Sequence, residues 1–124
     1  MGEKDLAAIL AEALPYVSRY IGKTIVVKLG GSALGSHDTT IEDVAICHKL
    51  GIRIVLVHGG GNAISQWIKR LGNEPRFVNG LRVTDDATME LVVMTLAGQV
   101  NKQLVAELQR HGGKAIGICG LDGK

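Results

Sequence analysis

Residues 24–31 read TIVVKLGG, a short run of mostly β-branched apolar residues that ends in two glycines. A second run of the same kind, RIVLVHGGG, fills residues 53–61. Nearly continuous apolar runs are typical of parallel strands buried between helices, since a strand with one wet face alternates apolar and polar residues. The sequence therefore predicts two buried strands, at 24–29 and 53–57, each followed by a glycine loop.

Helical patterns surround these two strands. Apolar residues recur at helical spacing in residues 5–20, where Pro15 predicts a kink, and in helices that end at Gly51 and Gly72. Asn79-Gly80 between two apolar pairs predicts a hairpin. A last helix is expected from a Thr84 cap to residue 111, with a bend at Gly98. Trp67 and Met89 are interpreted as core residues.

A third apolar run, residues 114–118, predicts one more strand. The order is then helix, β, α, β, α, hairpin, α, β, which favours an α/β fold with a mainly parallel sheet and right-handed crossovers. No helix follows the last strand. We therefore expect an uncovered face or edge of the sheet, and a missing C-terminal portion.

Composition excludes several classes of protein. The 124 residues suit one domain, and a net charge of +2 without any basic run argues against nucleic acid or a membrane surface as partner. The first residues run into an amphipathic stretch, so we expect no signal peptide, and no run of about 18 apolar residues is present that could cross a bilayer. Cys47 and Cys119 form no CxxC pair, so we expect reduced thiols in a cytoplasm and no protein-ligated metal.

Chemistry is expected where the two strands end. Glycine there lets backbone N–H groups approach an anion, and the next helix offers its positive end, although the glycines could simply make tight turns. Lys28, in an otherwise apolar strand, predicts a phosphate ligand, because a buried ammonium is costly without an anion. The alternative is a lysine whose head reaches solvent. Arg82 could bind a carboxylate or be a solvated hairpin arginine.

The other motifs in the sequence do not indicate a phosphate site or a catalytic residue. GxGxxG is absent and no P-loop is present, so neither of the better-known phosphate-binding motifs applies. His58, before the triple glycine, is expected to make a structural hydrogen bond rather than to act in catalysis. The other histidines lack ligand-like spacing.

Together these stretches resemble the amino-acid kinase family. The matching segments are residues 23–33, 57–61, 79–85, 98–102 and 117–120. The stretch NGLRVT at 79–84 is most similar to the family's acetylglutamate kinases. This resemblance implies a three-layer α/β/α sandwich whose N-terminal half, here residues 23–124, binds the amino acid. The nucleotide-binding half would then be absent, and residues 1–22 would form a kinked helix for oligomerisation and regulation.

The resemblance also implies a reaction. ATP, with Mg²⁺ bound to the nucleotide, would phosphorylate the side-chain carboxylate of N-acetyl-L-glutamate, an early step of arginine synthesis. Lys28 would stabilise the transferring phosphoryl group. The implied ligands of the phosphates are Lys28, Gly30 and Gly31, and those of the amino acid are Gly60, Gly61 and Arg82.

The N-terminal stretch, residues 12–16, resembles the extension of arginine-inhibited members of this family. There, kinked helices join dimers into hexamers, and a tyrosine matching Tyr16 lies near the arginine site. We therefore expect a homo-oligomer, from dimer to hexamer, inhibited by L-arginine. The alternative is that the helix, with its apolar stripe, folds back on its own domain.

Some positions depart from the family pattern, including Ile54, Asn62 and Leu121. The family's second lysine, its substrate-binding asparagine and its organising aspartate would lie beyond residue 124, so we expect a fragment that is inactive alone. Two alternatives stay open. One is a sister kinase for another acyl group, such as a carrier-linked aminoadipate. The other is a non-catalytic module that binds an acyl amino acid or a partner.

Overall fold

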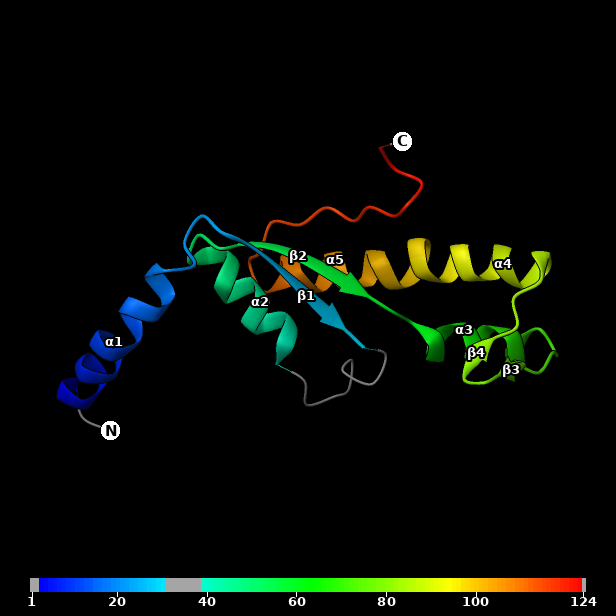
Figure 1. Cartoon of the computed structure of the whole chain (residues 1–124), viewed down its shortest axis with the longest axis horizontal. Coiled ribbons are helices and arrows are strands. Elements are labelled where there is room, and N and C mark those ends of the chain that lie inside the picture. Colours follow the sequence, from blue (N-terminus) through cyan, green and yellow to red (C-terminus); the bar gives the residue numbers. More distant parts are fainter. Residues whose placement is uncertain (1–2, 31–38, 124) are drawn as a thin grey trace.

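The computed structural model describes residues 3–30 and 39–123 (Figure 1). Within this part of the chain no helix is long and apolar enough to cross a membrane. The elements in chain order are α1 (Glu3–Ser18), β1 (Thr24–Leu29), α2 (Thr40–Lys49), β2 (Arg53–His58), α3 (Gly61–Arg70), β3 (Phe77–Val78), β4 (Leu81–Arg82), α4 (Asp86–Val93), the π-helical turn η1 (Met94–Val100) and α5 (Asn101–Arg110).

The predicted strands form a parallel pair. β1 and β2 run in register from Thr24 opposite Arg53 to Leu29 opposite His58. Leu29 is buried in a core cluster with residues of α2 and α5, and Leu56 of β2 packs against that cluster. Both strands are thus fixed by apolar contact with two helices, and the parallel α/β arrangement expected from the sequence is confirmed.

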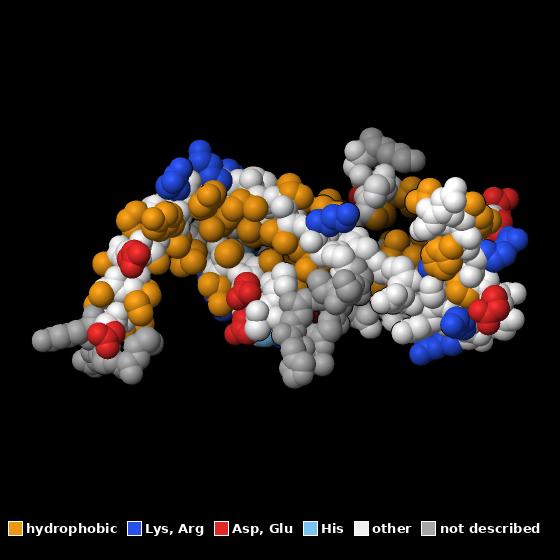
Figure 2. All heavy atoms as spheres, turned by 60° about the horizontal axis from the view of Figure 1, so that its bottom comes forward, with side chains coloured by type: hydrophobic (Ala, Val, Ile, Leu, Met, Phe, Trp, Pro, Cys, Tyr) orange, Lys and Arg blue, Asp and Glu red, His pale blue; other side chains and the backbone are white. Residues whose placement is uncertain are grey.

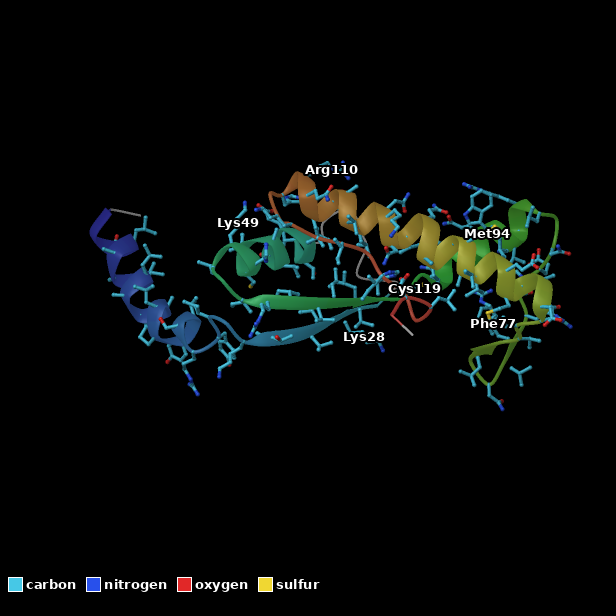
Figure 3. The ribbon with its side chains drawn as sticks, turned by 90° about the horizontal axis from the view of Figure 1, so that it is seen from above. Lys28, Lys49, Phe77, Met94, Arg110 and Cys119 are labelled. Atoms are coloured by element: carbon cyan, nitrogen blue, oxygen red, sulfur yellow. The ribbon has the colours of Figure 1, made fainter. Side chains whose placement is uncertain are left out.

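One face of this sheet is open. Figure 3 shows α2 and α5 on the same side of the two strands, with Lys28 on the other side. Val26, Val55 and Val57 alternate with the inward residues, and Val26 keeps 66% of its surface exposed. The expectation of an uncovered face is confirmed. Of the three expected layers, the described residues supply the sheet and one layer of helices.

The segment from residue 114 to 118 does not join the sheet, so the predicted third strand is wrong. It is extended, and its residues alternate between half-buried and exposed, but no ladder bond links it to β2. The carbonyls of Gly117 and Ile118 accept hydrogen bonds from side chains of α5 instead. A strand needs a backbone partner, and here side chains take that place, while Ile116 stays 88% exposed.

The long helix that follows the hairpin changes its winding. Residues 86–110 are continuous, but the η1 turn around Gly98 is π-helical, where a bend was predicted. The extra residue in a π turn rotates the buried stripe. Before this turn, Met89, expected in the core, is 50% exposed, because the face of α4 that packs against Ile64 and Ile68 of α3 carries Leu91 instead.

The start of this helix also differs from expectation. Asp85, not Thr84, is the N-cap, since its carboxylate accepts the Thr88 N–H at 2.9 Å. The Thr84 hydroxyl donates to the Arg82 carbonyl instead. The hairpin itself is confirmed: Asn79 and Gly80 have φ values of 50° and 78°, which the two central residues of a type I′ turn require.

Helix α1 projects away from the rest of the chain (Figure 1). It continues through Pro15 to Ser18, and its apolar stripe is exposed, with Leu14 at 58%. Figure 2 shows these hydrophobic side chains along the helix surface. In the turn between α1 and β1, the Gly22 N–H donates to the carbonyl of Gly51, which lies between α2 and β2, at 2.8 Å. In the described chain α1 therefore does not fold back on its own domain.

Candidate functional site

The two glycine loops begin side by side. Leu29 and His58 are opposite each other at the ends of β1 and β2, and the Gly59 N–H donates to the Leu29 carbonyl at 3.2 Å. Gly30 is exposed just beyond this bond. Gly31 lies outside the described residues. Gly30 and Gly59 thus lie at the same edge of the sheet, where the carboxyl ends of the two parallel strands meet.

The second loop leads directly into α3. Gly60 is its N-cap and Gly61 its first residue, and the first backbone bond runs from the Ile64 N–H to the Gly60 carbonyl at 3.1 Å. The N–H groups before Ile64 have no carbonyl of the helix to bind, which makes this end a donor site.

Gly60 is also required by packing. A Cβ atom there would lie 2.6 Å from a methyl carbon of Leu96 and 3.2 Å from one of Val100, both in η1. The π-helical turn thus lies directly against the loop. This close approach accounts for one glycine of the triple, independently of any ligand.

Arg82 reaches the same helix end from the hairpin. Its Nη2 donates to the Gly61 carbonyl at 2.9 Å and to the Ser65 hydroxyl at 2.8 Å, and its guanidinium carbon lies 4.7 Å from the centre of the Phe77 ring. Nη1 is buried without a hydrogen-bond partner among the described residues. Arg82 is therefore not a freely solvated hairpin arginine.

Ser65 was not singled out from the sequence. It follows Gly61 by four residues, so the two lie on one face of α3, and this helical spacing is the signal that could have identified it.

The electrostatics of this corner favour an anion. A guanidinium placed at the N-terminus of a helix sets a full positive charge beside the positive end of the helix dipole, an arrangement that a negatively charged ligand would relieve. Arg82 also offers planar donors suited to a carboxylate. The arrangement suits anion binding better than proton transfer.

Lys28 differs from its expected setting. It lies opposite Val57 in the register, and its side chain is exposed on the open face of the sheet (Figure 3). The argument from the cost of a buried ammonium is therefore wrong for this chain. The argument for a phosphate ligand at Lys28 then depends on its position alone. Lys28 comes two residues before Gly30, at the end of the sheet where both loops begin.

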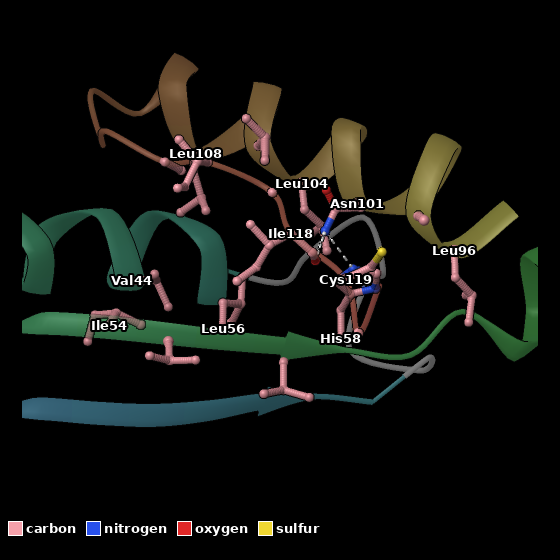
Figure 4. Close-up of a pocket in the computed structure, with 18 of the residues that line it drawn as sticks. Val44, Ile54, Leu56, His58, Leu96, Asn101, Leu104, Leu108, Ile118 and Cys119 are labelled. Atoms are coloured by element: carbon pink, nitrogen blue, oxygen red, sulfur yellow. Dashed lines mark hydrogen bonds between the residues drawn. The ribbon is translucent and has the colours of Figure 1, made fainter. Parts of the chain in front are cut away.

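A polar cluster lies between His58 and helix α5 (Figure 4). The sequence patterns did not single out its residues of α5. Asn101, only 8% exposed, has its amide nitrogen 3.3 Å from His58 Nε2 and 3.3 Å from the Ile118 carbonyl oxygen. Lys102 Nζ donates to the Asn101 amide oxygen at 3.1 Å and to the Gly117 carbonyl at 3.0 Å. His58 thus makes the structural hydrogen bond expected of it.

A cavity of about 890 Å³ lies between β2, α5 and residues 113–121 (Figure 4). Most of the side chains that line it are apolar, so it is a poor site for a charged amino acid or a phosphate. Representative lining residues are Val44, Ile54, Leu56, Leu104, Leu108 and Ile118.

Two further predictions, a regulatory role for Tyr16 and the lack of a protein-ligated metal, concern residues away from this corner. Tyr16 is 64% exposed on α1. Among the described residues no group of three or more His, Cys, Asp or Glu side chains is arranged to hold a metal ion.

Comparison with known proteins gives a consistent family. The model of the amino acid kinase family matches residues 23–124. An acetylglutamate kinase of Clostridium kluyveri is 50% identical over 99% of this chain and 44% of its own length. One of Heliobacterium modesticaldum is 52% identical over 96% of this chain and 41% of its own length. The chain thus spans less than half the length of the curated relatives it matches.

Solved structures agree in fold. A protein of Streptococcus mutans UA159 aligns with a TM-score of 0.63 and 35% identity over 72% of this chain and 37% of its own length. An N-acetylglutamate synthase of Neisseria gonorrhoeae, complexed with coenzyme A and N-acetyl-glutamate, aligns with a TM-score of 0.63 and 27% identity. That alignment covers 85% of this chain and 24% of the synthase.

Proposed function

This chain belongs to the amino acid kinase family, and from that premise we propose that it forms the amino-acid-binding part of an acetylglutamate kinase. The reaction is the phosphorylation of the side-chain carboxylate of N-acetyl-L-glutamate by ATP, in arginine biosynthesis. The observation that carries the proposal is about 50% identity to acetylglutamate kinases along almost the whole chain.

The geometry supports an amino-acid site at the start of α3. N-acetyl-L-glutamate carries two carboxylates, and one of them suits the corner made by Arg82 and the helix N-terminus. We assign the backbone N–H groups of Gly60 and Gly61 to the substrate and the Arg82 guanidinium to its α-carboxylate.

The phosphate chain of ATP, with its Mg²⁺, is assigned to the neighbouring loop. Glycine at positions 30 and 31 permits close approach of the backbone, and the Lys28 ammonium would stabilise charge on the transferring phosphoryl group. Phosphoryl transfer is catalysed mainly by positioning and by such charge stabilisation, so this assignment needs no general base.

Oligomerisation and regulation are part of the proposal. The exposed stripe of α1 suits packing against α1 of another subunit, with L-arginine as an inhibitor bound near Tyr16. A second N-acetylglutamate synthase structure, with a TM-score of 0.61 and 27% identity over 91% of this chain and 26% of the synthase, is a complex with coenzyme A and L-arginine.

A non-catalytic module that binds N-acetyl-L-glutamate is the second candidate. The observation behind it is that a similar chain forms part of an N-acetylglutamate synthase, which is not named a kinase and is complexed with N-acetyl-glutamate. A sister kinase for another acyl amino acid would keep the same Arg82 corner.

Calorimetric titration of this chain with N-acetyl-L-glutamate, L-glutamate and N-acetyl-L-aspartate tests the substrate site. We expect binding of N-acetyl-L-glutamate with clear preference over the other two. Trapping of the acyl phosphate as a hydroxamate, with the protein made from the whole gene, then separates the kinase from the binding module. Binding without ATP-dependent hydroxamate would refute the kinase, and equal binding of all three ligands would refute the assigned site.

A further inference from the structure

We propose that Asn101 is a positioning residue that, through His58, fixes the direction of the Gly60 N–H group in the glycine loop. The effect of Asn101 on substrate binding rests on the function proposed above. Its effect on the orientation of the Gly60 N–H does not. Asn101 comes from the first turn of α5 and His58 from the end of β2, 43 residues apart in the chain.

The orientation of the Asn101 amide follows from its fixed neighbours. Its oxygen faces the Lys102 ammonium, which can only donate, at 3.1 Å. Its nitrogen faces the Ile118 carbonyl, which can only accept, at 3.3 Å. One N–H of the amide therefore serves Ile118, and the second N–H is left for His58.

The tautomer of His58 follows in turn. Because the Asn101 nitrogen donates to Nε2 at 3.3 Å, Nε2 must be the acceptor and the ring proton must sit on Nδ1. Nδ1 lies 2.9 Å from the Gly59 carbonyl oxygen, which accepts that proton in a hydrogen bond. Every polar group in this chain of contacts is then correctly paired.

The bond to the Gly59 carbonyl acts on the next residue. The peptide group is planar, so the direction of the Gly59 C=O fixes that of the Gly60 N–H on the opposite side of the same plane. Gly60 is the N-cap of α3, and its N–H belongs to the donor group assigned to the substrate. Asn101 thus acts on the loop through the imidazole, without touching the ligand.

Gly117 and Lys102 hold the Asn101 side chain in this orientation. A Cβ at Gly117 would overlap with the Asn101 side-chain amide, so only glycine leaves it room. Lys102 holds the same segment through the Gly117 carbonyl. The buried amide therefore has a defined place, as expected of a group that orients another.

Long-range ¹⁵N–¹H NMR of the histidine rings in this chain at neutral pH gives the first test. The proposal requires the Nδ1–H tautomer for His58 in the wild-type protein, a result that needs no variant to fold. The Nε2–H tautomer would overturn it.

The Asn101→Asp variant gives the second test. Aspartate cannot donate, so Nε2 must donate to the carboxylate instead. Measured at a pH at which the His58 ring carries a single proton, this tautomer leaves Nδ1 bare, the bond to Gly59 should be lost, and the Gly60 amide resonance should shift. Asn101→Ala should also shift the Gly60 resonance. The exposed neighbour Gln103→Ala is the matched control and should change neither signal. An unchanged Gly60 resonance in Asn101→Asp and Asn101→Ala would overturn the proposal.

Calorimetry on the same proteins separates this inference from the proposed function. We expect Asn101→Asp to bind N-acetyl-L-glutamate about fivefold more weakly, on the scale of one lost hydrogen bond, and Gln103→Ala to bind normally. Unchanged affinity in Asn101→Asp would overturn the link to the substrate. A wild-type chain that does not bind the ligand refutes the proposed function, while the tautomer and the Gly60 resonance still decide the role of Asn101.

Discussion

Arg82 is the side chain whose contacts most restrict the chemistry of the site, since one guanidinium joins the hairpin, the first residue of α3 and Ser65. In Arg82→Lys, a single ammonium cannot make two parallel bonds to a carboxylate while stacking on Phe77. We expect N-acetyl-L-glutamate binding to weaken by roughly 1.5–3 kcal/mol, the scale of a hydrogen bond to a charged group. ATP affinity should barely change.

Calorimetry or steady-state kinetics on the protein made from the whole gene measures both affinities. Arg76→Lys is the control, since the Arg76 side chain is exposed just before the hairpin and, within the described residues, forms a 3.8 Å surface ion pair with Asp85 that contributes little. Equal weakening of both ligands by Arg82→Lys would indicate a folding defect instead of a lost clamp.

Lys28 supports a different prediction, because it is assigned to charge that develops during transfer. Lys28→Ala should lower kcat by orders of magnitude and leave the KM for N-acetyl-L-glutamate nearly unchanged. Since Lys28 is exposed, the variant should fold normally. Lys23→Ala, at an exposed position just before β1, is the control. A rise in KM alone would contradict the assigned role.

At the scale of elements, the N-cap of α4 gives a prediction about pH. The hydrogen bond from Thr88 lowers the pKa of Asp85, so the folded state favours its ionised form. The stabilisation is therefore fully present above the ordinary pKa of aspartate, about 3.9, and is lost as the pH falls through the lowered value. Asp85→Ala should lower the Tm at pH 7, and the difference should shrink in acid.

Thermal unfolding followed by circular dichroism at several pH values measures this effect. Asp85→Asn is the matched variant, since asparagine also caps helices but does not titrate. It should keep much of the wild-type Tm at pH 7. A wild-type advantage over Asp85→Ala that persists unchanged in strong acid would show that the carboxylate is not its source.

The elements also show what sequence patterns can and cannot predict. Both parallel strands and the Asn79-Gly80 hairpin were predicted, because each depends on local composition and turn chemistry. The segment 114–118 has the composition of a strand, but whether it pairs depends on a neighbouring backbone, which periodicity does not encode. The π-helical turn was missed for a related reason, since its packing against Gly60 is a tertiary contact.

At the scale of the whole molecule, the candidate site was predictable in part. Ligands lie at the carboxyl ends of parallel strands, and this rule alone was enough to predict that the loops of Gly30 and Gly59 would lie together. The rule could not predict that Ser65 or Asn101 would lie at the site, because Ser65 is placed there by its face of α3 and Asn101 by its contact with His58. The burial of Lys28 was predicted wrongly, because an apolar strand does not tell whether both of its faces are covered.

Helix α1 carries the last prediction. Its apolar stripe of Leu6, Ile9, Leu10 and Leu14 is exposed, and the helix projects from the rest of the chain. A stripe of this kind is typical of a surface that packs against another protein. We expect the protein made from the whole gene to be a hexamer inhibited by L-arginine. Deletion of residues 1–20 should leave an active dimer that L-arginine inhibits more weakly.

A point variant makes this test sharper than the deletion. Leu10→Asp places a charge on the stripe and should reduce the hexamer to a dimer, because a carboxylate buried between two helices lacks a partner. Ala8→Asp adds the same charge on the opposite face of the helix, and it should leave the hexamer intact. Light scattering gives the assembly size, and an L-arginine titration of activity gives the inhibition. A wild-type protein that remains dimeric and does not respond to millimolar L-arginine would contradict the prediction. Equal effects of the two aspartates would show that the stripe is not the contact surface.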